Sequence, residues 1–259
     1  MMMEKQSIFI TGAASGIGRA TALYFAEKGW FVGLFDIDET GLSELSRRIG
    51  EDRSCCRPMD VTRQESVKEA VRHFSQHTGQ KMDVLFNCAG ILRMGPHHRI
   101  DIDDQKQIVA VNLTGILHCI HECLSILKKT PGSAIVNMSS ASAVYGSPEL
   151  AVYSATKFAV RGLTEALNIE FEALGIRVSH VMAPYVQTPM ILDAKVQAIS
   201  VGRLGVHITP EQVAKVVWRA AHGNRVQWRV GALIQLLVFG MWSFPFARRF
   251  LVKTLAFHR

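Results

Sequence analysis

The sequence has few cysteines, no internal repeat and no low-complexity tract. Its five cysteines, an odd number that includes the adjacent pair Cys55 and Cys56, do not make the even framework of a disulfide-stabilised secreted domain. Cys119 and Cys123 lie four residues apart in an apolar helical pattern with no second ligand pair, so the sequence predicts core packing and no metal site. We therefore expect reduced thiols and a cytoplasmic location.

The start of the chain also lacks the pattern of a secretory leader. The apolar run Ser7–Ile10 is too short for a signal-peptide core and leads directly into a glycine loop. The net charge is +7 and the isoelectric point about 9.3, but the basic residues are dispersed. Their one local concentration, in an apolar tail, is Arg248, Arg249, Lys253 and Arg259. This pattern predicts no nucleic-acid partner and favours an anionic membrane or an acidic ligand instead.

Short apolar runs alternate with longer helical patterns along the chain. This alternation predicts repeated strand–helix units and hence an α/β fold, a single domain over residues 1–259 with a doubly wound parallel sheet and helices on both faces. Capping boxes predict helix starts at Thr62–Glu65 and Thr209–Gln212. The seven predicted strands are Ser7–Thr11, Phe31–Asp36, Ser54–Pro58, Val84–Asn87, Ala134–Ser139, Arg177–Met182 and Ala232–Phe239.

A glycine-rich loop follows the first predicted strand and opens a helix expected to begin near Arg19. Glycine at the first position permits a tight turn, at the second a close approach of a pyrophosphate, and at the third close packing of helix on strand. The free N–H groups and positive dipole end of the helix favour phosphate. The loop therefore predicts a dinucleotide site formed by Gly12, Ser15, Gly16, Ile17 and Gly18.

An acidic residue, Asp36, stands at the end of the second predicted strand. A carboxylate there can accept hydrogen bonds from the adenosine ribose and repels a 2′-phosphate. The loop carries Ser15 and no basic residue, so NAD is favoured over NADP. Asp38 is the competing acid, but its position in a turn predicts that it is solvated.

A tyrosine and a lysine stand one helical turn apart in Tyr153-Ser-Ala-Thr-Lys157, and Ser140 lies upstream. A phenol has an unperturbed pKa of about 10 and is a poor base near neutrality. An ammonium at i+4 favours the phenolate, whereas burial opposes it. We therefore expect Lys157 to lower the pKa of Tyr153 for proton transfer. The alternative is an exposed helix face on which the two residues have no chemical role.

Taken together, these motifs resemble the short-chain dehydrogenase/reductase superfamily from about Ser7 to Ala221. The family's strand-four signature is matched by Asn87-Cys88-Ala89-Gly90 and its helix asparagine by Asn112. The cofactor positions that the resemblance implies are Gly12, Ser15, Gly16, Ile17, Gly18, Asp36, Asp60, Val61, Asn87, Ala89, Gly90, Tyr153, Lys157, Pro184, Val186 and Thr188. It also implies a Rossmann-like fold and a homodimer or homotetramer, with contacts through the helices that follow Asp103 and Ser154.

The resemblance assigns catalytic roles to four residues. Tyr153 acts as general acid/base, Lys157 lowers its pKa and holds the nicotinamide ribose, and Ser140 hydrogen-bonds the reacting oxygen. Asn112 holds a water that links the lysine to solvent, with a helix asparagine bonded to backbone as the alternative. Ser139 and Ser142 compete for the polar role, but Ser140 alone matches the family position.

Three features depart from the family pattern. Cys88 replaces the second asparagine of the strand-four motif, and Tyr185 replaces the glycine usual after Pro184, placing a ring near the nicotinamide pocket. The family's common closing Val-Asp-Gly-Gly is missing from the tail, residues 230–259. The uncharged stretch Val230–Ala247 reaches the lower limit of a membrane span. We favour a buried last strand followed by a packed or oligomeric helix over peripheral membrane contact through Trp242, Phe244 and Phe246, and over a span.

Both walls of the expected cleft are apolar. Residues 187–207 occupy the family's lid, and Ile91–Met94 lies across from it. These walls predict a lipophilic secondary alcohol or ketone as substrate. The candidate substrate contacts are Met94, Ser140, Ser142, Tyr185 and Met190.

The favoured function is therefore an NAD-dependent oxidoreductase that transfers hydride between nicotinamide and a lipophilic secondary alcohol or ketone. Two alternatives stay open. One is a catalytically idle NAD(P)-binding scaffold or sensor. The other is a lipid-surface binding protein.

Overall fold

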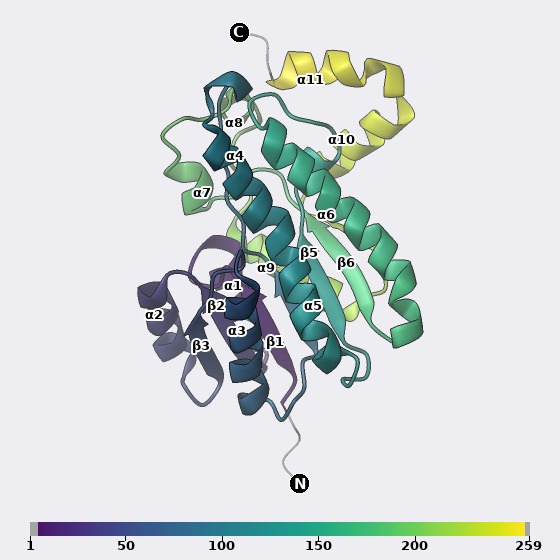
Figure 1. Ribbon diagram of the computed structural model, residues 1–259. Coiled ribbons are helices and arrows are strands. Elements are labelled where there is room, and N and C mark those ends of the chain that lie inside the picture. The colour runs from purple at the N-terminus through teal and green to yellow at the C-terminus, as the bar shows by residue number, and fades with distance from the viewer. Residues whose placement is uncertain (1–4, 257–259) are drawn as a thin grey trace.

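Seven parallel strands form one sheet at the centre of the computed structural model, which describes residues 5–256 (Figure 1). Their order across the sheet is β3-β2-β1-β4-β5-β6-β7, so the chain starts in the middle and winds outward in both directions. This order confirms the doubly wound, Rossmann-like fold. The strands are β1 (Ser7–Thr11), β2 (Phe31–Asp36), β3 (Ser54–Pro58), β4 (Val84–Asn87), β5 (Ala134–Met138), β6 (Arg177–Met182) and β7 (Gln227–Arg229).

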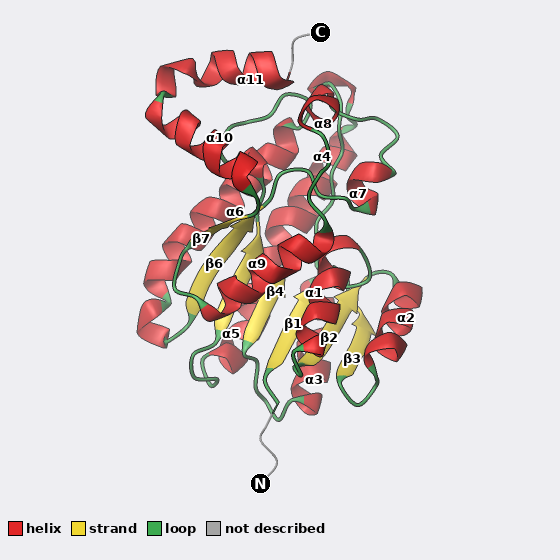
Figure 2. Ribbon diagram, turned by 180° about the vertical axis from the view of Figure 1, so that it is seen from behind, coloured by secondary structure: helices red, strands yellow, loops and turns green. Residues whose placement is uncertain are grey.

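Helices cover both faces of the sheet. Figure 1 shows α3 (Gln64–His77), α5 (Gly115–Leu127) and α6 (Ala151–Glu170) in front of it. The opposite view shows α1 (Gly16–Glu27) and α9 (Pro210–His222), with α2 (Glu39–Ile49) near one edge (Figure 2). Beyond the carboxyl ends of the strands lie α4 (Ile102–Val109), α7 (Pro189–Leu192), α8 (Ile199–Leu204), α10 (Ala232–Ser243) and α11 (Arg248–Ala256).

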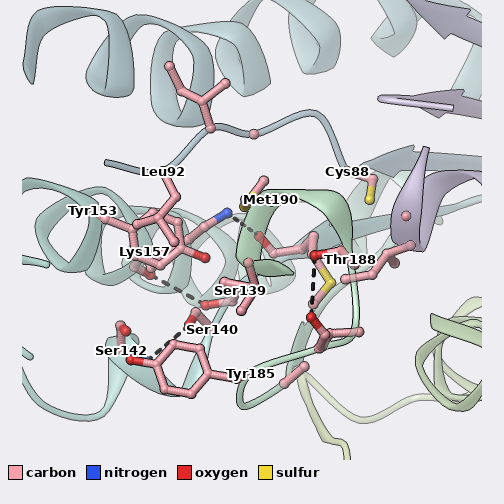
Figure 3. Close-up of a pocket in the computed structure, with 18 of the residues that line it drawn as sticks. Cys88, Leu92, Ser139, Ser140, Ser142, Tyr153, Lys157, Tyr185, Thr188 and Met190 are labelled. Carbon is pink, nitrogen blue, oxygen red and sulfur yellow. Dashed lines mark hydrogen bonds between the residues drawn. The ribbon is translucent and has the colours of Figure 1, made fainter. Parts of the chain in front are cut away.

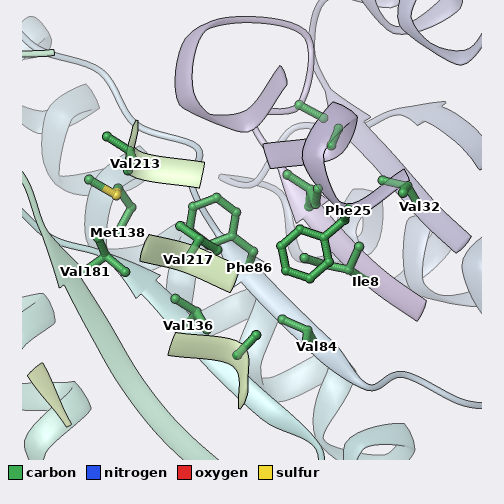
Figure 4. Packing of buried hydrophobic residues seen from close by; sticks show 14 of the residues in the cluster. Ile8, Phe25, Val32, Val84, Phe86, Val136, Met138, Val181, Val213 and Val217 are labelled. Carbon is green, nitrogen blue, oxygen red and sulfur yellow. The ribbon is translucent and has the colours of Figure 1, made fainter. Parts of the chain in front are cut away.

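The core lies in two layers because successive strand residues point to opposite faces. In β1, Ile8 and Ile10 pack with Phe25 of α1 on one side, while Phe9 stacks on Phe35 on the other. Figure 4 shows the first layer, in which strand side chains meet those of α1 and α9. Burying each large apolar side chain contributes about 1.5–3 kcal/mol, so these layers hold the strand ends in fixed register.

The parallel register brings every strand's carboxyl end to the same edge of the sheet. Thr11 pairs with Asn87 at the ends of β1 and β4, and Asn87 pairs with Asn137 near the end of β5. The chain turns to opposite sides after β1, with β2 on one flank and β4 on the other. In open sheets of this kind ligands bind at the crevice where the strand order reverses.

The last strand differs from the one predicted. β7 is Gln227–Arg229, and the predicted strand Ala232–Phe239 lies within helix α10. The ladder ends where Val230 donates to Met182, and Gly231 then turns the chain at a φ of +85°. A run of Ala, Leu, Ile and Gln favours a helix once it exceeds strand length, so the apolar character of this segment was a poor guide to its structure.

Of the two predicted capping boxes, one is confirmed and one is wrong. Thr209 accepts from the Gln212 N–H while the Gln212 side chain accepts from the Thr209 N–H. Helix α3, in contrast, begins at Gln64 without a side-chain cap. Thr62 donates to the Asp60 carboxylate instead, at 2.7 Å from Oγ1 to Oδ1, so the local Asx-type bond competes successfully with the cap.

Within the described residues, one helical stretch is long and apolar enough to cross a membrane by length and composition, and it runs from Ile102 to Leu127. It comprises α4, a π-helical turn at Ala110–Thr114, and α5. Its α5 part packs on the sheet with Ile116, Cys119 and Cys123 buried, as predicted for the two cysteines. The α5 part is therefore a core helix of the fold, whereas only Ile108 is buried in α4. Helix α10, with 12 residues, is shorter than a span requires.

Candidate active site

The glycine loop between β1 and α1 has the backbone geometry of a phosphate-binding turn. Gly12 adopts a φ of +71°, and a Cβ there would lie 2.8 Å from the Ala89 Cα. A Cβ on Gly18 would overlap the Gly12 carbonyl. Helix α1 begins at Gly16, three residues before the predicted start at Arg19, so its free N–H groups lie directly in the loop.

Thr11 joins the loop to the end of β4. Its Oγ1 accepts hydrogen bonds from the Cys88 and Ala89 N–H groups, both at 3.0 Å. The replacement of asparagine by Cys88 therefore leaves the backbone at the end of β4 tied to the loop, and burial raises the pKa of that thiol to about 12. Sequence reasoning missed the role of Thr11, whose only signal was a hydroxyl at the last position of a strand.

The acid after β2 faces the same cavity. Asp36 accepts from the Ala14 N–H at 3.0 Å and from the Asp38 N–H at 3.2 Å, so its carboxylate is fixed beside the glycine loop. Asp38 caps α2 by accepting from Gly41, is exposed, and does not line the cavity. The choice of Asp36 over Asp38 is thus supported by position. Further along the same wall lie Asp60 and Val61.

Two predicted residues support the site from behind. Asn87 is buried, and its Nδ2 donates to the Asn137 Oδ1 at 2.8 Å rather than facing the cavity. Asn112 lies in the π-helical turn, where its Oδ1 accepts from the Ile91 N–H at 2.8 Å and its Nδ2 donates to the Ile91 carbonyl at 2.9 Å. Asn112 therefore bonds backbone and positions the loop after Gly90, and its role in holding a water stays a prediction.

The three central residues meet at the end of β5 (Figure 3). Ser140 follows the strand, while Tyr153 and Lys157 project from α6 on the same side. The Ser140 side chain lies near the tyrosine hydroxyl, where hydrogen bonding from it favours the phenolate and so acts to lower the pKa of Tyr153. The lysine Nζ donates to the Met138 carbonyl at 2.9 Å and lies 5.5 Å from the centroid of the tyrosine ring. The predicted trio is thus assembled around one cavity.

Burial controls the ionisation of this trio. It raises the pKa of Tyr153 to about 12, with the Ser140 hydrogen bond opposing the rise, and it lowers the pKa of Lys157 to about 8. The prediction that Lys157 brings the tyrosine pKa below its ordinary value is wrong for this structure, because burial dominates the shift and the group that opposes it is Ser140. At neutral pH the tyrosine is therefore a protonated phenol, suited to donate a proton.

The neighbouring serines have separate roles. The Ser140 Oγ accepts from the Ser142 N–H at 3.1 Å, which leaves its own proton free to face the tyrosine or a bound oxygen. Ser139 donates to the Lys157 carbonyl at 3.4 Å and so ties β5 to α6. Ser142 lines the cavity, which is consistent with a substrate contact.

The whole cavity has a volume of about 440 Å³, and apolar residues line much of its substrate side, among them Leu92, Leu150 and Ile191. The Tyr185 hydroxyl lies 2.6 Å from the Ser200 Oγ, and its ring packs among buried apolar residues beside Tyr153. Met190 lines the cavity, but Met94 does not: it is buried behind the wall, where its sulfur accepts from the Ala198 N–H. Met94 is therefore a packing residue rather than a contact.

Most predicted site residues line this cavity. Those that line it are Gly12, Ser15, Gly16, Ile17, Gly18, Asp36, Asp60, Val61, Ala89, Gly90, Ser140, Ser142, Tyr153, Lys157, Pro184, Tyr185, Val186, Thr188 and Met190. Sequence reasoning missed three lining residues of the tail, Ile234, Met241 and Val252. Ile234 lies in the apolar run that was assigned to a strand, whereas Met241 and Val252 follow that run.

Away from the cavity, the structure brings together residues that the sequence did not connect. Cys55 of β3 and His73 and His77 of α3 have ligand atoms within 4.8 Å of one another. They lie toward the amino end of β3, opposite the edge where the cavity opens. None of the three lines the cavity, and the predicted chemistry requires no metal.

Comparisons with known proteins agree with this geometry. The sequence profile of the short chain dehydrogenases matches residues 6–197. The 3-oxoacyl-[acyl-carrier-protein] reductase FabG of Thermotoga maritima is 34% identical over 223 residues, which cover 84% of this chain and 90% of the relative. Cyclohexanol dehydrogenase of an Acinetobacter strain is 32% identical over 215 residues, covering 80% and 84%.

A solved structure shows the same likeness. A 3-ketoacyl-(acyl-carrier-protein) reductase from Brucella melitensis, complexed with NADH, superposes with a TM-score of 0.80 at 28% identity over 88% of this chain and 97% of its own. The glycine loop, the buried Ser–Tyr–Lys trio, the profile match and these relatives lead to one conclusion. The chain belongs to the short-chain dehydrogenase/reductase family of NAD(P)-binding oxidoreductases.

Proposed function

We propose that this protein is an NAD-dependent dehydrogenase/reductase that interconverts a lipophilic secondary alcohol and its ketone. One observation carries the proposal: the side chains of Tyr153 and Ser140 line a cavity that has a glycine loop at one end and apolar walls at the other. Proton transfer, dinucleotide binding and an apolar ligand thus meet in one place.

The residues present fit a dinucleotide. A Cβ at Gly12 or Gly18 would collide with backbone atoms, so the loop is open to a phosphate only with glycine at these positions. The first turn of α1 begins in this loop. The Asp36 carboxylate is held beside that cradle, where it favours ribose hydroxyls and repels a 2′-phosphate. The NADH complex of the Brucella relative supports the preference for NAD.

Each side chain of the trio has a definite task. In ketone reduction Tyr153 donates its phenolic proton to the substrate oxygen, and in alcohol oxidation its phenolate removes the hydroxyl proton. Ser140 orients that oxygen by hydrogen bonding, and the Lys157 ammonium stabilises the phenolate when it forms. A bound nicotinamide supplies or accepts the hydride. Asn112 holds the Ile91 backbone that forms the adjoining wall.

The walls support a lipophilic substrate. Leu92, Leu150 and Ile191 pack with Tyr185 around the reacting end, and Met190 also lines the cavity. Few charged groups reach this part of the cavity, so a polyanionic or sugar-like ligand would lose its hydration without compensation. The relative that acts on cyclohexanol supports an apolar alcohol as well.

Calorimetry with NAD and NADP, followed by an absorbance screen at the reduced-nicotinamide band, tests the proposal. We expect tighter binding of NAD and turnover of hydrophobic secondary alcohols. Tighter binding of NADP would contradict the role of Asp36, and absence of turnover across a broad alcohol and ketone panel would favour the idle scaffold or sensor.

We also propose that the protein is a homodimer or homotetramer. Ile102 of α4, Leu117 of α5 and Phe158 of α6 are apolar and 59%, 45% and 41% exposed on the helices predicted as contact surfaces. Sedimentation velocity would measure the association directly. An Ile102→Asp/Phe158→Asp variant is expected to shift the protein toward monomer, whereas an unchanged sedimentation coefficient would contradict this surface. The cytoplasmic location stays a prediction.

A further inference from the structure

The last two helices expose large apolar side chains to solvent. After β7 the chain leaves the sheet, and α10, a short turn at Pro245–Ala247 and α11 form an arm beyond the carboxyl edge (Figure 2). Phe246, at 84% exposed, is the most exposed of these side chains. The others on the arm are Leu236, Phe239, Phe244 and Phe250. Aromatic side chains of this size are seldom left in water on a surface without a function.

The arm is also basic. From Gln212 to Arg259 the sequence contains no aspartate or glutamate, while it contains Lys215, Arg219, Arg225, Arg229, Arg248, Arg249, Lys253 and Arg259. Arg249 and Lys253 are exposed on α11, next to Phe250. The Arg248 guanidinium donates to the Met241 carbonyl and so joins the turn to α10. The exposed apolar side chains are therefore accompanied by cations on an arm that has no acidic residue of its own.

The other side of the arm forms part of the cavity. Ile234 and Met241 of α10 are buried and line it, together with Val252 of α11 and Leu204 of α8. Arg203 of α8 donates to the Thr254 carbonyl of α11, which links the predicted lid segment to the arm. One pair of helices thus roofs the substrate cavity with one face and presents aromatic rings to solvent with the other.

This combination favours a bilayer over a second copy of the chain. A two-fold interface would place the same patch of both subunits face to face, so Arg249 and Lys253 would meet their own copies without an acid on either arm. Anionic headgroups supply the missing charge, and the Phe rings fit the interfacial region just below them.

We infer that α10 and α11 dock the protein on an anionic lipid bilayer, from which the roofed cavity takes its apolar substrate. The docking depends on the arm alone, whereas the identity of the substrate rests on the proposed function. The arm brings the opening of the cavity to the place where a lipophilic alcohol partitions. The side chain of Trp242, predicted as a contact, lies outside the described part of the structure.

Co-sedimentation of the full-length protein with vesicles tests the docking. Vesicles of phosphatidylglycerol and phosphatidylcholine are expected to bind at least tenfold more protein than vesicles of phosphatidylcholine alone, and added salt is expected to reduce the difference. Equal binding to both compositions, or none to either, would overturn the inference.

Surface variants identify the groups responsible. Phe246→Asp/Phe250→Asp is expected to lower vesicle affinity at least tenfold, and Arg249→Glu/Lys253→Glu to abolish the preference for anionic lipid. The matched control, Ile169→Asp/Leu174→Asp, removes exposed apolar side chains near the far end of α6 and is expected to bind as the unmodified chain does. NAD binding is measured for every variant. Unchanged NAD binding shows that the substitutions leave the rest of the fold intact.

The outcomes separate docking from catalysis. If the phenylalanine variant binds vesicles normally but sediments as a smaller oligomer, the face contacts a second copy and the inference fails. If the protein binds anionic vesicles but oxidises no lipophilic alcohol presented in them, docking stands and the proposed function fails. Faster turnover of membrane-dissolved alcohol by the unmodified chain than by the phenylalanine variant supports both.

Discussion

The two ends of the cavity are built by different means. At the cofactor end, backbone N–H groups and a few fixed side chains set the geometry, as where Thr11 holds Cys88 and Ala89 and where Asp36 holds Ala14. At the substrate end, apolar side chains from the lid and the arm fill space with few directional bonds. A hydrogen-bonded turn tolerates few residue types, whereas an apolar wall tolerates many of similar volume. Binding of the cofactor and selection of the substrate are therefore separable properties of this fold.

Removal of the Tyr153 hydroxyl has the largest expected effect, because this group lies where the cofactor end and the substrate end of the cavity meet. Tyr153→Phe is expected to lower turnover by about 10²–10⁴-fold, because general acid–base catalysis contributes about that much. NAD affinity, measured by calorimetry, is expected to change little. Tyr24→Phe, on α1 and outside the cavity, is the matched control. Retained turnover in Tyr153→Phe would favour the idle scaffold.

The sheet that carries both regions contains a buried histidine, His180 of β6, whose ring nitrogens have no hydrogen-bond partner in the described structure. Burial lowers its pKa to about 4, with Arg161 and Arg229 adding to the shift and Glu165 opposing it. The unfolded chain then takes up the proton first as pH falls. The free energy of unfolding is expected to drop by about 3 kcal/mol between pH 6.5 and pH 4.

Denaturant titrations at several pH values measure this dependence. His180→Leu has no titrating ring at that position and is expected to be less sensitive to pH over the same window. An equal slope in the two proteins would show that other groups cause the acid destabilisation.

The nucleotide preference tests the cofactor end alone. Asp36→Ala is expected to weaken NAD binding by about tenfold, since a hydrogen bond to a charged group contributes about 1.5–3 kcal/mol, and to strengthen NADP binding. Asp38→Ala is the matched control: loss of the α2 cap lowers stability by about 1 kcal/mol without altering the preference. Calorimetry with both nucleotides measures the preference. An equal loss of affinity for NAD and NADP would contradict the role of Asp36.

The smallest expected effect concerns the substrate end. Tyr185→Gly removes the ring that narrows the cavity and is expected to favour bulkier alcohols by up to about tenfold, since a difference of one or two methylene groups in an apolar site is worth about 1–3 kcal/mol. Tyr185→Phe keeps the ring, loses the Ser200 bond and is expected to retain the original ranking. Relative kcat/KM values over a substrate panel measure both. An unchanged ranking in the glycine variant would place the selective wall elsewhere.

The cofactor end of the cavity could be predicted from the sequence, whereas the substrate end could be predicted only in part. The glycine loop, Asp36 and the trio could be predicted because phosphate binding and proton transfer require particular residue types at particular spacings. The arm was not predicted, because the periodicity of a continuous apolar run does not distinguish a buried strand from a buried helix, and the length and composition that favour a helix were not given enough weight. The tyrosine pKa was predicted in the wrong direction for a related reason: the i+4 lysine is visible in the sequence, whereas the depth of burial is not.

The most direct test that catalysis and substrate selection are separate is a profile of kcat/KM across the 2-alkanols from butanol to dodecanol. It is measured for the unmodified chain, Tyr153→Phe and Tyr185→Gly. We expect Tyr153→Phe to lower every member of the series by the same large factor and Tyr185→Gly to change the ranking with little change in the best rate. A Tyr153→Phe profile that is re-ranked rather than uniformly lowered would contradict the assignment of catalysis to the buried trio and of selection to the apolar walls.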